Sequence, residues 1–219
     1  MPADRLLIFA RQPVPGKVKT RLAAALTPEA AAAVYEASLH DVLRLAARER
    51  GRVELWYDGG PQAERYFSEE FPVLRVVRQA PGDLGARMHD AFDRSFRDGA
   101  ERVIILGSDS PTLPEAHLNA AFDTLHEHRA VIGPAIDGGY YLIGLRADAW
   151  PAAAVLFSDM AWSTSTVLEQ TLQRAAEAGI AVHSVPQWYD IDTIDDLRVA
   201  ADDVLPDSRL YACLKDLPL

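Results

Sequence analysis

Near its start the chain reads RLLIFARQPVPGKVKTR over residues 5–21, and this stretch sets the expected fold. The apolar run Arg5–Ala10 is short and ends in a loop that contains proline and glycine, which predicts a buried strand. Thr27 and Pro28 follow as a cap and a first helical residue, and they predict the start of a helix. A buried strand followed by a helix is the building unit of a parallel α/β sheet.

The same alternation continues along the rest of the chain. The helix after Thr27 is expected to bury the residues at helical spacing, Tyr35, Leu39, Val42, Leu43 and Ala46. We expect strands over Arg5–Ala10, Val53–Tyr57, Val73–Val77, Arg102–Leu106, Ala130–Ile136, Tyr140–Leu145 and Val182–Pro186. We expect further helices over Gln62–Glu69, Ala86–Phe96, Thr112–His126 (with capping-box spacing from Thr112 to Glu115), Thr164–Ala178 (with Val167, Leu168, Thr171, Leu172 and Ala175 inward) and Thr193–Asp203.

This order predicts an α/β fold, a mostly parallel sheet that is covered by helices on both faces. Asp137 and Gly138 stand between two apolar runs and are typical of a hairpin, which would make the sheet mixed. Ligands of open α/β sheets bind outside the carboxyl ends of the strands. The loops at those ends are rich in Gly, Pro, Asp, Arg and Ser, so we expect the site there.

Length and composition exclude several classes of protein. The 219 residues are 49% hydrophobic and 25% charged, which is ordinary for a globular chain, and no linker divides them, so one domain over residues 1–219 is expected. The single cysteine, Cys213, rules out an internal disulfide framework. The apolar runs are too short for a membrane span or a signal peptide, so we expect a cytoplasmic protein without membrane partners. The net charge of −10 argues against nucleic acid as a partner.

A cluster of cations interrupts this acidic balance. Arg11, Lys17, Lys19 and Arg21 lie in one segment without an acid among them. Such a loop after the first strand suits a small anion such as a di- or triphosphate. It is not a Walker A loop, since Arg11 stands in place of its first glycine and a valine follows Lys17. A solvated loop is the alternative interpretation.

Acidic residues follow two other predicted strands. Asp109 comes directly after an apolar strand, where a carboxylate can hold Mg²⁺ against phosphate oxygens, or where it can simply complete a turn. Asp190 and Asp192 alternate in an extended segment and point the same way. Asp192 or Thr193 can also cap the helix that follows.

Two further segments carry less specific signals. Gly138, Gly139 and the following Tyr140 form either a hairpin turn or a place where backbone approaches a substrate. Gly82–Arg87 is a candidate pocket for a base, and Trp162-Ser163-Thr164 offers hydroxyl and N–H groups to an anion or simply caps a helix.

Taken in order, these segments resemble a known family. The opening Phe9-Ala10-Arg11-x-Pro13-x-Pro15-Gly16-Lys17-x-Lys19-Thr20-Arg21-Leu22 resembles that of the bacterial glycosyltransferases associated with radical-SAM and selenium-domain neighbours, or arsenosugar-biosynthesis type, in the nucleotide-diphospho-sugar transferase superfamily. Gly82–Met88, Gly107–Leu113, Gly133–Gly144, Trp162–Thr164 and Asp190–Leu197 match as well. The segment Lys19–Leu22 is also similar to the phospholactate guanylyltransferases.

The resemblance implies a GT-A-type, Rossmann-like three-layer sandwich and a divalent cofactor, Mg²⁺ or Mn²⁺. It implies metal ligation by Asp109 with Asp192 or Asp190, and catalytic roles for Asp109, Lys17, Arg21 and Asp137. The implied nucleotide-binding residues are Ala10, Arg11, Gly16, Lys17, Arg21, Gly82, Leu84, Gly85 and Ser108. The implied acceptor-binding residues are Asp137, Gly138, Gly139, Tyr140, Trp162, Ser163 and Thr164.

The implied reaction has two forms. One transfers a glycosyl group from a nucleotide sugar to a small-molecule acceptor, and this form is the first expectation. The other transfers a nucleotidyl group from a nucleoside triphosphate to a phosphorylated small molecule and releases pyrophosphate. Many GT-A glycosyltransferases carry Asp-x-Asp at the metal, whereas this chain has Ser108-Asp109-Ser110, which is closer to the nucleotidyltransferase arrangement. A nucleotide-binding module without catalysis is a third alternative, and a homodimer is compatible with each of them.

Overall fold

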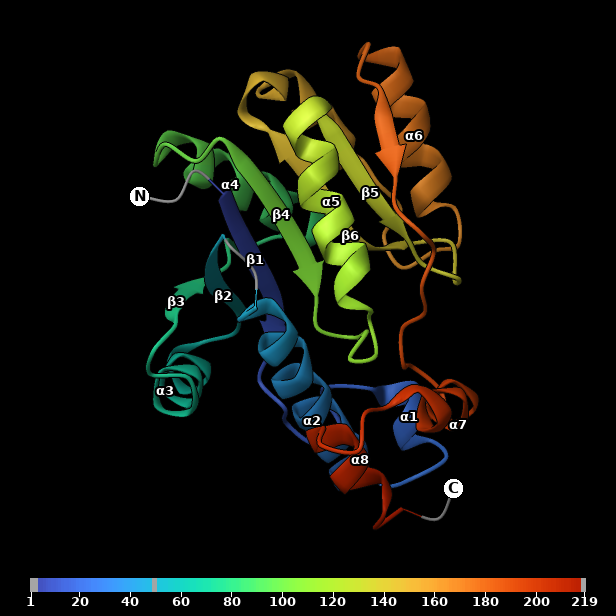
Figure 1. The fold of residues 1–219 in the computed structure, drawn as a ribbon. Helices are drawn as coiled ribbons and strands as arrows, with labels where there is room; N and C mark the ends of the chain where they lie inside the picture. Colours follow the sequence, from blue (N-terminus) through green and yellow to red (C-terminus); the bar gives the residue numbers. More distant parts are fainter. Residues whose placement is uncertain (1–3, 49–50, 218–219) are drawn as a thin grey trace.

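The structure, a computed structural model, describes residues 4–48 and 51–217. Its centre is a seven-stranded sheet with the order β3-β2-β1-β4-β6-β5-β7 (Figure 1). The strands are β1 (Asp4–Arg11), β2 (Arg52–Asp58), β3 (Arg75–Arg78), β4 (Arg102–Gly107), β5 (Ala130–Pro134), β6 (Tyr140–Arg146) and β7 (Val182–Ser184). Strand β6 is antiparallel to β4 and β5, while every other neighbouring pair is parallel. The predicted α/β fold with a mixed, mostly parallel sheet is confirmed.

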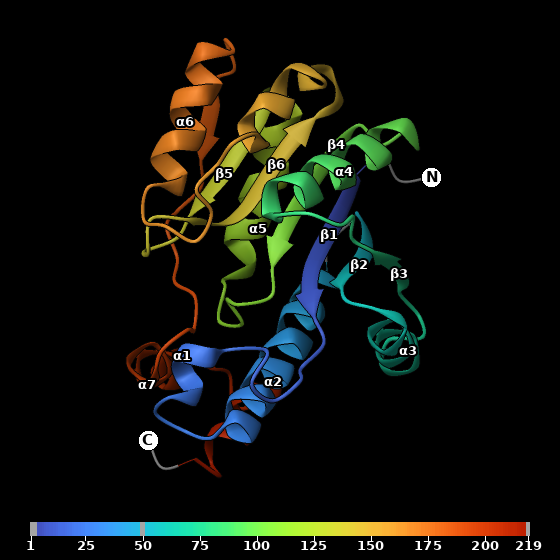
Figure 2. The ribbon, with the colours of Figure 1, turned by 180° about the vertical axis from the view of Figure 1, so that it is seen from behind.

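Helices cover both faces of this sheet and make three layers (Figures 1 and 2). On one face lie α2 (Pro28–Ala46), α3 (Pro61–Glu70) and α5 (Glu115–Glu127), and on the other lie α4 (Leu84–Arg97), α6 (Val167–Glu177) and the 3-10 helices η1 (Ala147–Ala149) and η2 (Ala152–Phe157). Strand β1 shows why both faces are apolar: Leu6 and Ile8 enter one core, and Leu7 and Phe9 enter the other.

A third, smaller core lies beyond the carboxyl end of β1. Three helices, α1 (Thr20–Ala23), α7 (Ile194–Asp203) and α8 (Arg209–Leu214), pack there against α2 (Figure 1). Leu22, Leu197 and Leu210 are completely buried in this core. The sequence did not predict α1 or α8, because segments of four and six residues are too short to show a helical repeat.

The predicted starts of α2 and α7 are correct, and a threonine side chain caps each of these helices. Thr27 accepts a hydrogen bond from the Ala30 N–H, as expected for the cap of α2. The predicted capping box at Thr112 and Glu115 is wrong, since α5 begins only at Glu115 and the Thr112 hydroxyl bonds to Tyr189 instead.

Several other predicted boundaries are wrong by two residues or more. Helix α4 begins at Leu84 rather than Ala86, and β5 and β7 each end two residues earlier than predicted. Helix α6 begins at Val167 rather than Thr164, because Ser163 is left-handed and the Thr164 hydroxyl donates to the Ala161 carbonyl. Leu172, predicted inward, is exposed. Strand β3 begins two residues later than predicted, since Val73 lies in a turn and is 93% exposed.

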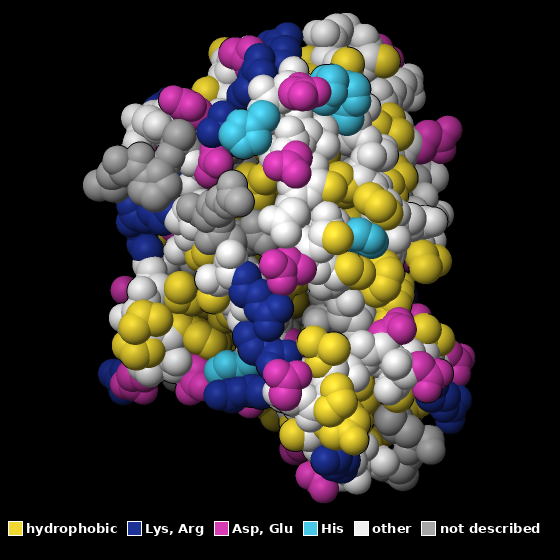
Figure 3. All heavy atoms as spheres, viewed as in Figure 1, with side chains coloured by type: hydrophobic (Ala, Val, Ile, Leu, Met, Phe, Trp, Pro, Cys, Tyr) yellow, Lys and Arg dark blue, Asp and Glu magenta, His cyan; other side chains and the backbone are white. Residues whose placement is uncertain are grey.

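The surface mixes charges of both signs. On the face in Figure 3, Lys and Arg side chains lie among Asp and Glu side chains, with hydrophobic groups between them. Within residues 4–48 and 51–217, no helix is long and apolar enough to cross a membrane.

Candidate functional site

A cleft lies along the edge of the sheet at which β1 and β4 end. It consists of two adjoining cavities of about 440 Å³ and 810 Å³. The first is lined by the ends of β1 and β4 and by the basic loop, and the second extends to the segment before α6. Both cavities are lined by Arg11, Lys19, Thr20, Leu84, Asp109, Tyr140, Ser163 and Asp192. The regions predicted to bind the donor and the acceptor therefore meet in one cleft.

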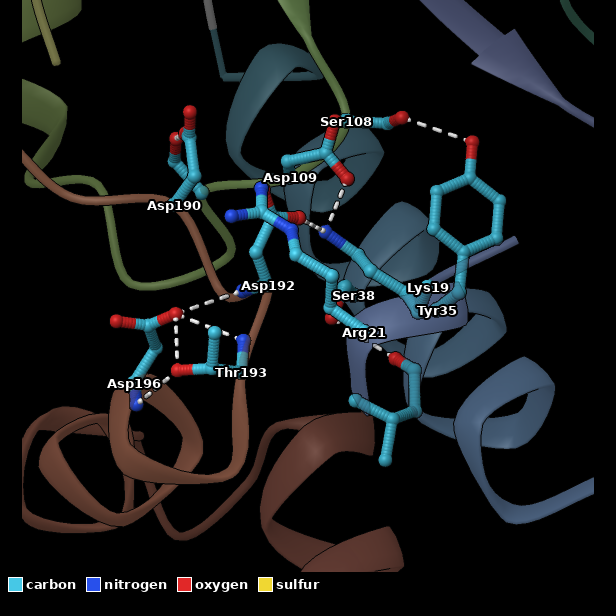
Figure 4. A network of polar contacts seen from close by, with 12 residues as sticks. Lys19, Arg21, Tyr35, Ser38, Ser108, Asp109, Asp190, Asp192, Thr193 and Asp196 are labelled. Carbon is cyan, nitrogen blue, oxygen red and sulfur yellow. Dashed lines mark hydrogen bonds and ion pairs between the residues drawn. The ribbon is translucent and has the colours of Figure 1, made fainter. Parts of the chain in front are cut away.

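Lys19 lies at the centre of the acidic part of this cleft (Figure 4). Its ammonium forms ion pairs with Oδ1 of Asp109 and, at 3.1 Å, with Oδ1 of Asp192. The Lys19 side chain is only 3% exposed, whereas those of Asp109 and Asp192 are 43% and 31% exposed. The ammonium thus lies beneath the two carboxylates, which reach the cleft.

The charges around Lys19 fix its protonation. Burial alone would lower the pKa of its ammonium, but the attraction of Asp109 and then of Asp192 outweighs burial and raises that pKa. Lys19 is therefore charged at neutral pH. Its backbone has φ +45°, a left-handed conformation that a side chain rarely adopts and that the surrounding contacts must hold.

Asp190 lies deeper than its neighbours. Its carboxylate accepts a hydrogen bond from the Ser110 hydroxyl. Burial, and next the negative charge of Asp109, raise the pKa of Asp190 to about 7. The Ile191 N–H donates to the Asp109 carbonyl at 2.9 Å, which joins the segment of Asp190 and Asp192 to the loop after β4.

Thr193, and not Asp192, caps the helix that follows them. Thr193 caps α7, and its partner in the capping box is Asp196. Asp196 also accepts the Asp192 N–H at 3.1 Å. The Asp192 carboxylate takes no part in the cap and faces Lys19 and Arg21 (Figure 4).

Tyr35 of α2 forms hydrogen bonds with the carboxyl end of β1 and with the residue that follows β4. Its hydroxyl lies 2.9 Å from the Arg11 N–H, from which it accepts, and 2.9 Å from Oγ of Ser108. Burial, with the negative charge of Asp109, raises the pKa of Tyr35 to about 12. Ser108, predicted to bind nucleotide, is buried and directs its hydroxyl to Tyr35.

The cations of the basic loop differ in their surroundings. Arg21 pairs with Oδ2 of Asp192, and Arg11 lies 3.5 Å from Asp58, which also pairs with Arg87. Lys17 lines the first cavity and makes no ion pair with another residue in the described part of the chain. The loop is thus partly neutralised by acids at the rim of the cleft.

The glycines predicted to contact nucleotide differ in location. Gly85 is packed against the Phe157 carbonyl and the Trp162 ring, so its lack of a side chain serves helix packing. Gly82 has φ +118° and its carbonyl accepts from Arg87, while Gly16 has φ +74° in an open turn. Ala10 and Leu84 line the first cavity.

The predicted acceptor residues gather around the second cavity. Asp137, Gly139, Tyr140, Trp162, Ser163 and Thr164 all line it. Gly138 is packed against the Ser165 backbone instead, and its φ of +90° makes the turn. Asp137 accepts the Gly139 N–H at 2.9 Å, and the Tyr140 hydroxyl points away towards Met88.

The acidic residues offer oxygen ligands of the kind that Mg²⁺ or Mn²⁺ prefers. Among the described residues, no group of three or more His, Cys, Asp or Glu side chains could hold a metal ion. Asp109 and Asp192 do converge on one point, the Lys19 ammonium. This pair fits a site at which substrate and water oxygens would complete the shell, as is usual for Mg²⁺.

Sequence reasoning missed the two residues that assemble the site. Lys19 was noted only as one cation of the loop, because its partner Asp192 is 173 positions away in the sequence. Tyr35 was expected as a core residue of α2, and its hydrogen bonds to Arg11 and Ser108 have no local sequence signal.

Comparison with known proteins agrees with this fold. A structure described as a candidate nucleotide-diphospho-sugar transferase from Desulfovibrio desulfuricans G20 is 34% identical, covers 99% of this chain and 95% of its own, and has a TM-score of 0.92. The Rv0371c protein of Mycobacterium tuberculosis H37Rv in complex with manganese has 18% identity and a TM-score of 0.54, over 93% of this chain and 100% of its own, which shows a common fold.

A curated relative agrees with the similarity noted at Lys19–Leu22. The 2-phospho-L-lactate guanylyltransferase of Methanothermobacter thermautotrophicus (strain Delta H) is 28% identical over 182 residues, which cover 82% of this chain and 76% of that protein. Residues 41–164 match a family of bacterial proteins. The chain belongs to this family, described as "Uncharacterized protein conserved in bacteria (DUF2064)".

Proposed function

We propose that this protein is a nucleotide-using transferase that transfers a nucleotidyl group from a nucleoside triphosphate to a small-molecule acceptor. The observation that carries the proposal is the convergence of Asp109 and Asp192 on Lys19 beside a polar cavity. Similarity to a guanylyltransferase and the single acid in Ser108-Asp109-Ser110 support nucleotidyl transfer.

In this reaction an acceptor oxygen attacks the α-phosphorus of the triphosphate. The bond from that phosphorus to the oxygen that bridges the α- and β-phosphates breaks, and its electron pair leaves with pyrophosphate. Negative charge grows on the leaving group, so the cations of the cleft act by stabilising it. Lys17 and Arg21 are the exposed cations for this role, and Lys19 supplies a fixed positive charge below them.

A divalent ion, Mg²⁺ or Mn²⁺, held by Asp109 with Asp192 or Asp190, would add Lewis-acid stabilisation of the phosphate oxygens. Ala10, Arg11, Gly16, Gly82, Leu84, Gly85 and Ser108 would form the nucleotide side of the site. Asp137, Gly138, Gly139, Tyr140, Trp162, Ser163 and Thr164 would form the acceptor side, within one domain over residues 1–219. The carboxylate of Asp137 is exposed and is the acid that could take a proton from an acceptor hydroxyl.

Glycosyl transfer from a nucleotide sugar is the second candidate. It is favoured by the 34% identity to the Desulfovibrio protein, which is described as a candidate nucleotide-diphospho-sugar transferase. In this reaction an acceptor oxygen would attack the anomeric carbon, and the nucleoside diphosphate would leave. The same cations would stabilise that leaving group.

One pair of assays separates these reactions. The protein is incubated with Mg²⁺, a mixture of small phosphorylated and hydroxylated acceptors, and each nucleoside triphosphate or nucleotide sugar in turn. Release of pyrophosphate supports nucleotidyl transfer, and release of a nucleoside diphosphate supports glycosyl transfer. Nucleotide binding without either product would contradict both reactions and favour a binding module.

A further inference from the structure

Arg21 and Lys19 both pair with Asp192, but in different ways. Lys19 contacts Oδ1 from below and is 3% exposed, whereas Arg21 contacts Oδ2 from the cleft and is 65% exposed. Arg21 makes no other ion pair within the described residues. One of the two cations is therefore fixed in the protein, and the other lies at the surface on a single contact.

The two oxygens of Asp192 are thus both occupied by cations. Oδ1 of Asp109 is also taken by Lys19, so the oxygens that bond Lys19 face the protein. A metal ion held by both acids would approach from the cleft and use Oδ2 of Asp109 and Oδ2 of Asp192, and it cannot share the Asp192 atom with Arg21 without strong repulsion. Arg21, unlike Lys19, can leave its contact without exposing a buried charge.

We propose that Arg21 is an exchangeable counter-ion of Asp192. It occupies one of the carboxylate oxygens that a divalent ion between Asp109 and Asp192 would use, and donor phosphates draw it away, so that metal and nucleotide assist one another's binding. Lys19 stays in place and holds Asp109 and Asp192 together. This proposal rests on the proposed function only in assuming a metal and a phosphate donor, because its test involves no transfer reaction.

The test uses Mn²⁺ alone, titrated into the whole protein without nucleotide and followed by the electron paramagnetic resonance signal of free Mn²⁺. Arg21→Ala should raise the affinity for Mn²⁺ by about three- to tenfold, since it frees Oδ2 of Asp192 from an exposed ion pair and removes a positive charge. Arg11→Ala is the matched control, because Arg11 is 64% exposed in the same loop but pairs with Asp58. It should change the Mn²⁺ affinity less than twofold.

A second titration uses inorganic tripolyphosphate without metal. Arg21→Ala should weaken this binding by about tenfold, so that one substitution moves the two affinities in opposite directions. An Arg21→Ala protein whose Mn²⁺ affinity is no higher than that of Arg11→Ala would overturn the proposal, as would a lack of Mn²⁺ binding by both wild type and variant. If Arg21→Ala does not fold, Arg21→Gln gives the same comparison. Failure of the proposed function is seen separately, in the product assays.

Discussion

Lys19 contacts two carboxylates from distant parts of the chain, so its removal should affect both of them. Lys19→Met keeps most of the side-chain volume but removes the cation shared by Asp109 and Asp192, so that Asp192 keeps only its ion pair with the exposed Arg21. We expect the free energy of unfolding to fall by about 1–3 kcal/mol, which is less than for a fully buried pair because both acids are partly exposed. Urea denaturation measures this change.

Lys17→Met is the control for this substitution. Lys17 lies two positions earlier, is exposed and makes no ion pair among the described residues, so its loss should leave the free energy of unfolding within about 0.5 kcal/mol of wild type. Equal stability losses in the two variants would show that Lys19 does not hold the acids.

Asp109 is expected to act on ligand binding more than on folding. Asp109→Asn keeps the shape of the side chain but removes the charge, so Mg²⁺ should no longer strengthen nucleotide binding. We expect the gain in nucleotide affinity on adding Mg²⁺ to fall by about tenfold or more, as measured by calorimetry. The titration without Mg²⁺ serves as the internal control, and an undiminished gain in the variant contradicts the assignment of Asp109 to the metal.

Residue type and position in the strand pattern were sufficient to find most of the residues that line the cleft. Asp109, Asp192 and Arg21 follow or flank predicted strands, and the carboxyl ends of parallel strands meet at one edge. The pairing of Lys19 with two acids could not be predicted in this way, because it depends on where the segment of Asp192 returns across the sheet. The close packing of Gly85 against the Phe157 carbonyl and the Trp162 ring could not be predicted either, because both partners lie more than seventy positions away.

The cap of α7, Thr193, directly follows Asp192 of the cleft, so a change in the cap should also affect the site. Thr193→Ala removes the cap hydroxyl and should reduce the free energy of unfolding by about 1 kcal/mol. Because Asp192 directly precedes the cap, metal-dependent nucleotide binding should weaken as well. Both quantities are measured on the same protein, by urea denaturation and by calorimetry.

Thr27→Ala provides the matched control at the start of α2. Its hydroxyl also caps a helix, so it should reduce stability by a similar amount, about 1 kcal/mol. No carboxylate of the cleft adjoins this cap, and nucleotide binding should be unchanged. If both variants lost binding equally, general destabilisation rather than the position of Asp192 would explain the result.

A helix or strand could be predicted where its own residues show the apolar spacing of that type of structure. In the described part of the chain, all seven strands and the six α-helices of ten or more residues were predicted, because their apolar spacing or composition is visible in one segment. The first residues of α5 and α6 were not predicted correctly, since they depend on contacts with other segments, such as that of Thr112 with Tyr189. Helices α1 and α8 form against the third core, and packing rather than propensity explains them.

The folded protein should become less stable in weak acid because of two histidines. Burial lowers the pKa of His40 and of His117 below the ordinary value of about 6.5. The unfolded chain therefore binds more protons than the folded protein below this pH. The stability from keeping these side chains neutral is present above about pH 6.5 and is lost as the pH falls through their folded values.

The contribution of the two histidines is measured by comparing how the stability of wild type and of a variant without them depends on pH. The double variant His40→Gln, His117→Gln should lose less stability than wild type between pH 7.5 and pH 5.5, as measured by urea denaturation. Asp190, whose pKa is raised, acts in the opposite direction in both proteins and cancels in the comparison. His126→Gln changes an exposed histidine at the end of α5 and should retain the wild-type dependence. A double variant that matched wild type would contradict the assignment.

The antiparallel direction of β6 affects which mutations the protein can accept near the cleft. If β5 and β6 were parallel, a crossover of a dozen or more residues, usually a helix, would have to connect them. That helix would begin at the carboxyl end of β5, beside the cleft. Because β6 is antiparallel to β5, a tight turn connects them instead, and Asp137 and Gly139 of this turn line the second cavity. On this side the second cavity is lined by exposed residues of the turn and of the segment before α6, such as Asp137, Ser163 and Thr164. Under the proposed function, we expect mutations there to alter the choice of acceptor and to leave the nucleotide side of the site unchanged.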